Sequence, residues 1–112
     1  MEKLYSLEEL EAISDGDKGF ITTMKQIFEE EMLISLDKLN KAFADKDLNT
    51  IRLTAHTMKP SIDNLHINSV RDEVRLLESM ATGNASLDVL LPLAQKVESV
   101  IRDVIADMKA TA

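Results

Sequence analysis

A histidine and a lysine, His56 and Lys59, stand three residues apart in a stretch whose apolar spacing is that of a helix. Residues three and four apart share one face of a helix, so the two side chains should project along one strip. A neutral imidazole is a competent nucleophile near pH 7, and an ammonium group one turn away can stabilise negative charge. The arrangement therefore suits chemistry at the surface of a helix better than packing in a core, although a surface histidine by itself is usually inert.

An apolar stripe turns this pair toward solvent. Its members recur at alternating spacings of four and three residues: Ile51, Ala55, Met58, Ile62 and Leu65. At about 100° per residue, His56 falls on the side of the helix away from that stripe. Arg52 and Asp63 lie along the same strip as His56, and Asp63 is placed to pair with Lys59 four residues before it.

The sequence around this histidine resembles the signature of the histidine-containing phosphotransfer (HPt) domain, H-x-L-K-G-S-x-x-N-L-G-A. The matching positions are His56, Met58, Lys59, Pro60, Ser61, Asn64, Leu65, His66 and Ile67. The similarity extends back to about Phe20, so it covers roughly half of the chain. Three residues depart from the signature: Pro60 and His66 replace glycines, and Asp63 replaces a small residue.

The resemblance implies that His56 accepts a phosphoryl group from the aspartyl phosphate of a receiver domain and passes it to another receiver. Phosphoryl transfer depends on positioning and charge neutralisation, and Lys59 would supply a point charge to the phosphoryl oxygens. We expect no cofactor or metal site on this chain, because Mg²⁺ would come with the receiver of a response regulator or hybrid kinase. The chain would be a stoichiometric phosphotransfer protein without turnover of its own.

The resemblance also implies that a receiver docks on the face around His56. Leu53 and Pro60 flank His56 on the helical wheel and are expected as apolar contacts, with Arg52 and Asp63 as polar ones. Proline lacks an N–H group, and the ring of Pro60 clashes with the carbonyl of His56. Because the apolar stripe keeps its phase through Pro60, we expect one helix, bent there, and not two.

Composition limits the class of protein. The 112 residues suit one domain over residues 1–112, and with few Gly, Pro and aromatic residues and no strand-like alternation they predict an all-α fold. The formal net charge of −7 argues against nucleic acid as a partner. The chain has no cysteine, and no apolar run reaches membrane-spanning length. We expect a cytoplasmic monomer that does not bind membranes.

Helices are expected before the motif helix. A short one should cover residues 6–13, with Ser6 and Glu9 forming a capping box. A long one should cover Lys18–Ala44, and Asp47 should cap the motif helix itself.

Two more helices should follow the motif. Asn68 or Ser69 can cap the first, whose inward side would hold Val70, Val74, Leu77 and Met80. Gly83-Asn84 marks a loop, and the last helix should begin after Ser86 or near Pro92. Short connections join neighbours, so the four longer helices predict an antiparallel four-helix bundle with the short helix over one end.

Other classes of protein remain open. The dimerisation domain of a sensor histidine kinase carries a similar box, H-E-L-R-T-P-L, but here Thr57 replaces its acidic residue and Pro60 comes one place early. The stretch after the motif, Ile67–Ala112, is expected to form two helices and not a nucleotide-binding half. A helical adaptor without chemistry is the second alternative. A metal site in the bundle is the weakest, because His66 would lie roughly 15 Å along the helix axis from His56.

Overall fold

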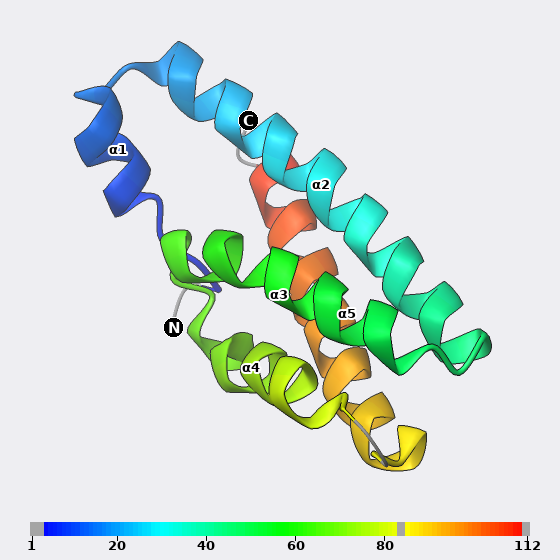
Figure 1. The fold of residues 1–112 in the computed structure, drawn as a ribbon. Coiled ribbons are helices and arrows are strands. Elements are labelled where there is room, and N and C mark those ends of the chain that lie inside the picture. The colour runs from blue at the N-terminus through cyan, green and yellow to red at the C-terminus, as the bar shows by residue number, and fades with distance from the viewer. Residues whose placement is uncertain (1–3, 83–84, 111–112) are drawn as a thin grey trace.

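The computed structural model describes residues 4–82 and 85–110, and the regular structure within these ranges is entirely helical. The helices are α1 (Glu8–Ser14), α2 (Lys18–Ala44), α3 (Leu48–Asn64), α4 (Arg71–Met80) and α5 (Leu87–Ala110), with a 3₁₀ turn at Asn68–Val70 (Figure 1). The prediction of an all-α fold is confirmed. In the described part of the chain, no helix is both long and apolar enough to cross a membrane.

Aspartate side chains fix where the two central helices begin. Asp17 caps α2 by accepting hydrogen bonds from the N–H groups of Gly19 and Phe20, at 2.9 and 3.3 Å. Asp47 caps α3 as predicted, accepting from the N–H of Thr50 at 3.1 Å and from its hydroxyl at 2.6 Å. These bonds satisfy N–H groups that have no partner inside the helix, and α2 and α3 start at the expected places.

The predicted capping box at the first helix is wrong. The helix α1 begins at Glu8, and Ser6 accepts a hydrogen bond from the Glu8 N–H at 3.2 Å without standing at the N-cap. The backbone N–H of Ser6 instead donates to the carbonyl of Leu65, which ties this segment to the end of α3. Glu9 lies 3.2 Å from His66 and so does not reach back to Ser6.

The predicted caps of the fourth helix are also wrong. Asn68 and Ser69 lie within the 3₁₀ turn, and α4 begins only at Arg71 without a side-chain cap. His66, just before this turn, has a positive φ of 52°. The left-handed region favours glycine, the residue that the HPt signature has at this position, and histidine is one of the side chains that tolerate it best. The Gly83-Asn84 loop lies outside the described residues.

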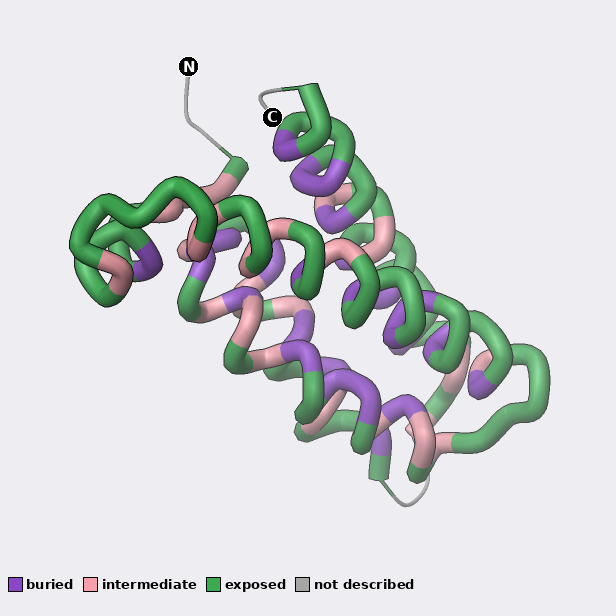
Figure 2. Tube along the Cα trace, turned by 90° about the horizontal axis from the view of Figure 1, so that it is seen from above, coloured by how far each residue is buried: buried purple, intermediate pink, exposed green. Residues whose placement is uncertain are grey.

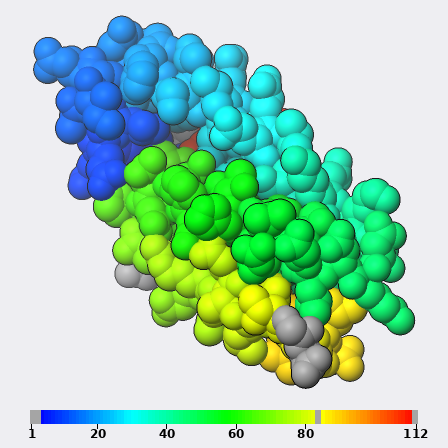
Figure 3. Space-filling model, viewed as in Figure 1, coloured from blue at the N-terminus to red at the C-terminus, as the bar shows by residue number. Residues whose placement is uncertain are grey.

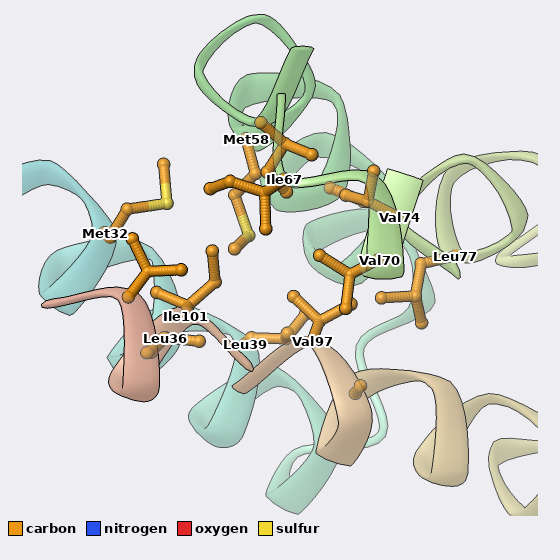
Figure 4. Close-up of a cluster of buried hydrophobic side chains, with 14 of the residues drawn as sticks. Met32, Leu36, Leu39, Met58, Ile67, Val70, Val74, Leu77, Val97 and Ile101 are labelled. Carbon is orange, nitrogen blue, oxygen red and sulfur yellow. The ribbon is translucent and has the colours of Figure 1, made fainter. Parts of the chain in front are cut away.

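One hydrophobic core lies between α2, α3, α4 and α5, and its side chains point toward one another in Figure 4. The predicted stripe of α3 is buried in full: Ile51, Ala55, Met58, Ile62 and Leu65. The predicted stripe of α5 is buried as well: Leu90, Ala94, Val97, Ile101, Val104 and Met108. In α4, Val74 and Leu77 face inward but Met80 is exposed, because Ala81 takes the inward place four residues after Leu77.

The packing order leaves one side of α3 open to solvent. α3 packs against α2 and α4, and α5 packs against the same two helices from the other side. Buried residues therefore line the inner sides of the helices in Figure 2. Figure 3 shows the outer side of α3 lying between α2 and α4 at the surface.

Pro60 stands inside α3 without dividing it. The helix continues from Leu48 to Asn64, so the prediction of a single helix is confirmed. Because Pro60 has no N–H, the carbonyl of His56 lacks its usual helical donor. Pro60 is exposed, so water can reach this part of the backbone. The bend at Pro60 stays a prediction.

Met58→Ala should lower the free energy of unfolding by about 2–5 kcal/mol, because it leaves a cavity where a fully buried side chain stood. The matched control is Leu53→Ala, on the same helix but 47% exposed, which should change stability by less than about 0.5 kcal/mol. Urea unfolding followed by circular dichroism measures both. Equal losses would contradict the assignment of the inner and outer faces of α3.

Candidate functional site

A carboxylate from α4 joins the two residues that were predicted to do the chemistry. Oε2 of Glu78 lies 2.6 Å from Nδ1 of His56, and Oε1 of Glu78 accepts a hydrogen bond of 2.6 Å from Nζ of Lys59. The His56 side chain is 68% exposed, whereas those of Lys59 and Glu78 are 27% and 22% exposed. One partly buried carboxylate thus holds an exposed imidazole and an ammonium group in a fixed relation.

The contact at Nδ1 determines which imidazole nitrogen is free to react. A neutral imidazole has one N–H and one lone pair, and an ionised carboxylate can only accept a hydrogen bond. Glu78 therefore favours the tautomer with the proton on Nδ1 of His56. The lone pair then lies on Nε2, the nitrogen that Glu78 does not contact.

The antiparallel pairing of α3 and α4 brings Glu78 to this place. Asp63, at the end of α3, faces Arg71 and Arg75 near the start of α4, whereas Lys59, one turn earlier in α3, faces Glu78 further along α4. Positions 71, 75 and 78 are spaced by four and three, so they share one face of α4. That spacing was visible in the sequence and is the signal by which Glu78 could have been found.

The predicted pair between Lys59 and Asp63 does not form. Lys59 turns to Glu78, and Asp63 accepts a hydrogen bond of 2.7 Å from Nη2 of Arg75. Nε of Arg71 lies 3.3 Å from the other oxygen of Asp63, Oδ1, and the two atoms form an ion pair. Both atoms are buried, and neither makes a hydrogen bond within the part of the chain that the structure describes. The hydrogen bond from Arg75 is the main cause that lowers the pKa of Asp63.

Glu78, His56 and Lys59 form one cluster, the Glu78 cluster. The other predicted residues lie outside it, on the same surface as His56. Arg52 is partly exposed and donates from Nη2 to the side-chain oxygen of Asn49 at 2.8 Å. Leu53 and Pro60 are exposed on the outer side of α3, as predicted. The structure therefore brings His56 and Lys59 together and leaves Arg52, Leu53 and Pro60 around them.

A groove between α2 and α3 runs beside His56. Its volume is about 430 Å³, and its lining includes Ser35, Lys38 and Lys41 from α2 and Leu53, Thr54 and Thr57 from α3. Thr57 is the immediate neighbour of His56 in the chain, and Leu53 lies three residues before it. Asp45 and Asp47 also line the groove, and Lys41 pairs with Asp45, so the surface beside the exposed imidazole combines apolar side chains with charges of both signs.

The charged groups of the site are the carboxylate of Glu78 and the ammonium group of Lys59. The pKa of Glu78 is lowered, chiefly by the hydrogen bond from Lys59 and next by the one with His56, so the carboxylate is ionised at neutral pH. Over residues 4–82 and 85–110, no three acidic or histidine side chains gather closely enough to hold a metal ion. A nucleophilic nitrogen beside an ammonium group can take up a negatively charged electrophile such as a phosphoryl group.

Comparison with known families shows that residues 23–111 match the Hpt domain. The match begins in the second turn of α2, includes all of α3, α4 and α5, and leaves α1 outside. Searches of curated proteins and of solved structures gave no significant match.

Lys59→Met should raise the pKa of Glu78 toward the ordinary glutamate value of 4.5, because the hydrogen bond from Lys59 is the largest cause of its lowering. A carboxylate whose pKa is lowered by folding stabilises the fold above its unfolded pKa. The contribution of Glu78 is therefore complete above about pH 4.5 and is lost as the pH falls through the lower folded value. Carboxyl ¹³C NMR titration measures this pKa.

The matched control is Lys96→Met, because Lys96 donates to Glu73 at 2.6 Å on the opposite side of α4. This variant should raise the pKa of Glu73, which is lowered chiefly by Lys96, and leave that of Glu78 unchanged. An unchanged pKa of Glu78 in Lys59→Met would show that the contact with Lys59 does not persist in solution.

Proposed function

Because this chain belongs to the Hpt domain family, a family of phosphotransfer domains in two-component signalling, we propose that it is a phosphorelay intermediate with His56 as the phosphoacceptor. One observation supports this function above the others. The exposed imidazole of His56 is held through Nδ1 by Glu78, with the ammonium group of Lys59 on the same carboxylate. The match over residues 23–111 also favours this function over the dimerisation domain of a sensor kinase.

In the proposed reaction, Nε2 of His56 attacks the phosphorus of an aspartyl phosphate on a receiver domain. The N–P bond forms as the bond between phosphorus and the aspartate oxygen breaks, and the receiver keeps its carboxylate. The ring becomes positively charged, and the Nδ1 proton stays hydrogen-bonded to Glu78, whose negative charge stabilises it. Transfer to a second receiver is the same step in reverse.

Lys59 neutralises charge on the phosphoryl oxygens in this proposal. An ammonium group has three N–H donors, and the hydrogen bond to Glu78 uses one of them. The others can be directed at the equatorial oxygens, where positioning and charge are the main contributions that a protein makes to phosphoryl transfer. The divalent cation, Mg²⁺, would come with the receiver, so the chain itself supplies a nucleophile and a positive charge.

We further infer that the receiver docks on the outer side of α3, over His56. Hpt domains interact with receiver domains, and the partner must bring its aspartate within reach of Nε2. Leu53 and Pro60 flank His56 there, and the groove beside Leu53 continues the surface onto α2. Arg52 and Asp63 would contact the receiver at the edge of the same face. A relay must release its partner after each transfer, which favours a small and transient interface.

We take α2 to α5 as the antiparallel four-helix bundle that carries this site. Each of the four helices packs against two of the others, and the family match covers these four but not α1. The outer side of α3 then lies between two neighbours, α2 and α4. This position allows α4 to supply Glu78 and α2 to supply part of the docking surface.

His56→Gln should abolish phosphoryl uptake from a phosphorylated receiver, because glutamine has no nucleophilic ring nitrogen. In the wild-type protein the label should be lost in acid and kept in base, as expected of a phosphoramidate. The matched control is His66→Gln, which removes the other histidine and should keep full uptake. Label on the His56→Gln protein, or its loss from His66→Gln alone, would refute the assignment.

Leu53→Asp should weaken receiver binding at least about tenfold, equivalent to about 1.4 kcal/mol, because it places a charge at an apolar contact. Its helical circular dichroism should be unchanged, since Leu53 is exposed. The control is Leu91→Asp, which alters a leucine of α5 that is similarly exposed. Titration against a receiver measures both variants, and equal affinities would remove Leu53 from the interface.

A further inference from the structure

Asp63 holds two arginines of α4 next to the Glu78 cluster. Arg75 donates from Nη2 to Asp63 at 2.7 Å and from Nη1 to the carbonyl of Arg71 at 3.2 Å. Arg71 itself faces the other oxygen of Asp63 at 3.3 Å. Two acceptors therefore hold the guanidinium group of Arg75. Both lie toward the start of α4, whereas Glu78 lies toward its end.

Without Asp63, Arg75 would be left with two other carboxylates of α4 that act on it electrostatically, Asp72 and Glu78. Arg75 and Glu78 are three residues apart on α4, a spacing at which side chains of opposite charge meet on a helix surface. The planar guanidinium fork matches the two oxygens of a carboxylate better than an ammonium group does. Those two oxygens of Glu78 are the ones that bind His56 and Lys59.

We propose that Asp63 is a positioning residue that keeps Arg75 away from Glu78 and so reserves both Glu78 oxygens for His56 and Lys59. The geometric part of this proposal concerns only contacts between α3 and α4. Its consequence for phosphoryl uptake rests on the proposed function of His56. Asp63 stands where the HPt signature commonly has a small residue, so the proposal gives a role to one of the departures of this chain.

Asp63→Asn removes the charge that holds Arg75 and keeps the size of the side chain. A neutral amide oxygen holds the guanidinium more weakly than a carboxylate does, so Arg75 should then compete for Glu78 and loosen the contact at Nδ1 of His56. ¹⁵N NMR of the histidine ring nitrogens at neutral pH should show the protonated-Nδ1 tautomer losing its predominance. Phosphoryl uptake from phosphoramidate, a small donor that needs no docking surface, should slow roughly two- to fivefold, the range for a partly exposed ion pair.

The double variant Asp63→Asn/Arg75→Gln separates positioning from a merely structural role. It lacks the same ion pair but also lacks the competing arginine, so the ring signals and the uptake rate should return to within about twofold of the wild type. Thermal unfolding should show similar stability losses in both variants, because both lack the pair between Asp63 and Arg75.

Three results bear on the proposal. Ring signals unchanged in Asp63→Asn would overturn it, as would a double variant that stays as disturbed as the single one. The third result is that Asp63→Asn loses the tautomer and the double variant recovers it, while the wild-type protein takes up no phosphoryl group. This result would support the positioning role of Asp63 and overturn the proposed function.

Discussion

The candidate site depends on the two contacts that the Glu78 carboxylate makes, one with His56 and one with Lys59. An imidazole exposed on a helix can otherwise rotate and change tautomer, and an exposed lysine samples many conformations. Glu78 removes this freedom from both groups, because its two oxygens bind Nδ1 of His56 and Nζ of Lys59 at 2.6 Å each. Its pKa is lowered by these same partners, so it is ionised at neutral pH and its hydrogen bonds are charge-assisted.

The hydrophobic core determines whether Glu78 can reach its partners. Burial of the apolar stripe of α3 turns His56 outward, and burial of Val74 and Leu77 sets the rotation of α4. Insertion or deletion of one residue in either helix would rotate the rest of that helix by about 100°. His56 and Lys59 would then no longer face Glu78. Packed helices are rigid elements, and a site built on them keeps its geometry better than a site on loops. The buried apolar residues of α3 and α4 thus set the helix rotations, and the polar side chains at the surface make the contacts of the site.

Local patterns were sufficient to predict most of the fold, and His56 and Lys59 in the site, but not Glu78, which joins them. The limits of α2, the Asp47 cap and the buried faces of α3 and α5 follow from nearby residues, and the structure has them as predicted. Glu78 was missed because its contact with His56 spans 22 positions and depends on how α3 and α4 align. The expected partner of Asp63 was wrong for the same reason, since Arg75 of α4 competes better than Lys59 of its own helix.

In the proposed phosphoryl transfer, Glu78 leaves Nε2 of His56 as the nucleophile. The most direct test is NMR of the phosphorylated, ¹⁵N-labelled protein, in which one-bond coupling to ³¹P identifies the nitrogen that carries the phosphoryl group. Coupling at Nε2 of His56, with the proton retained on Nδ1, is the predicted result. Coupling at Nδ1, or phosphate on any other residue, would contradict the account.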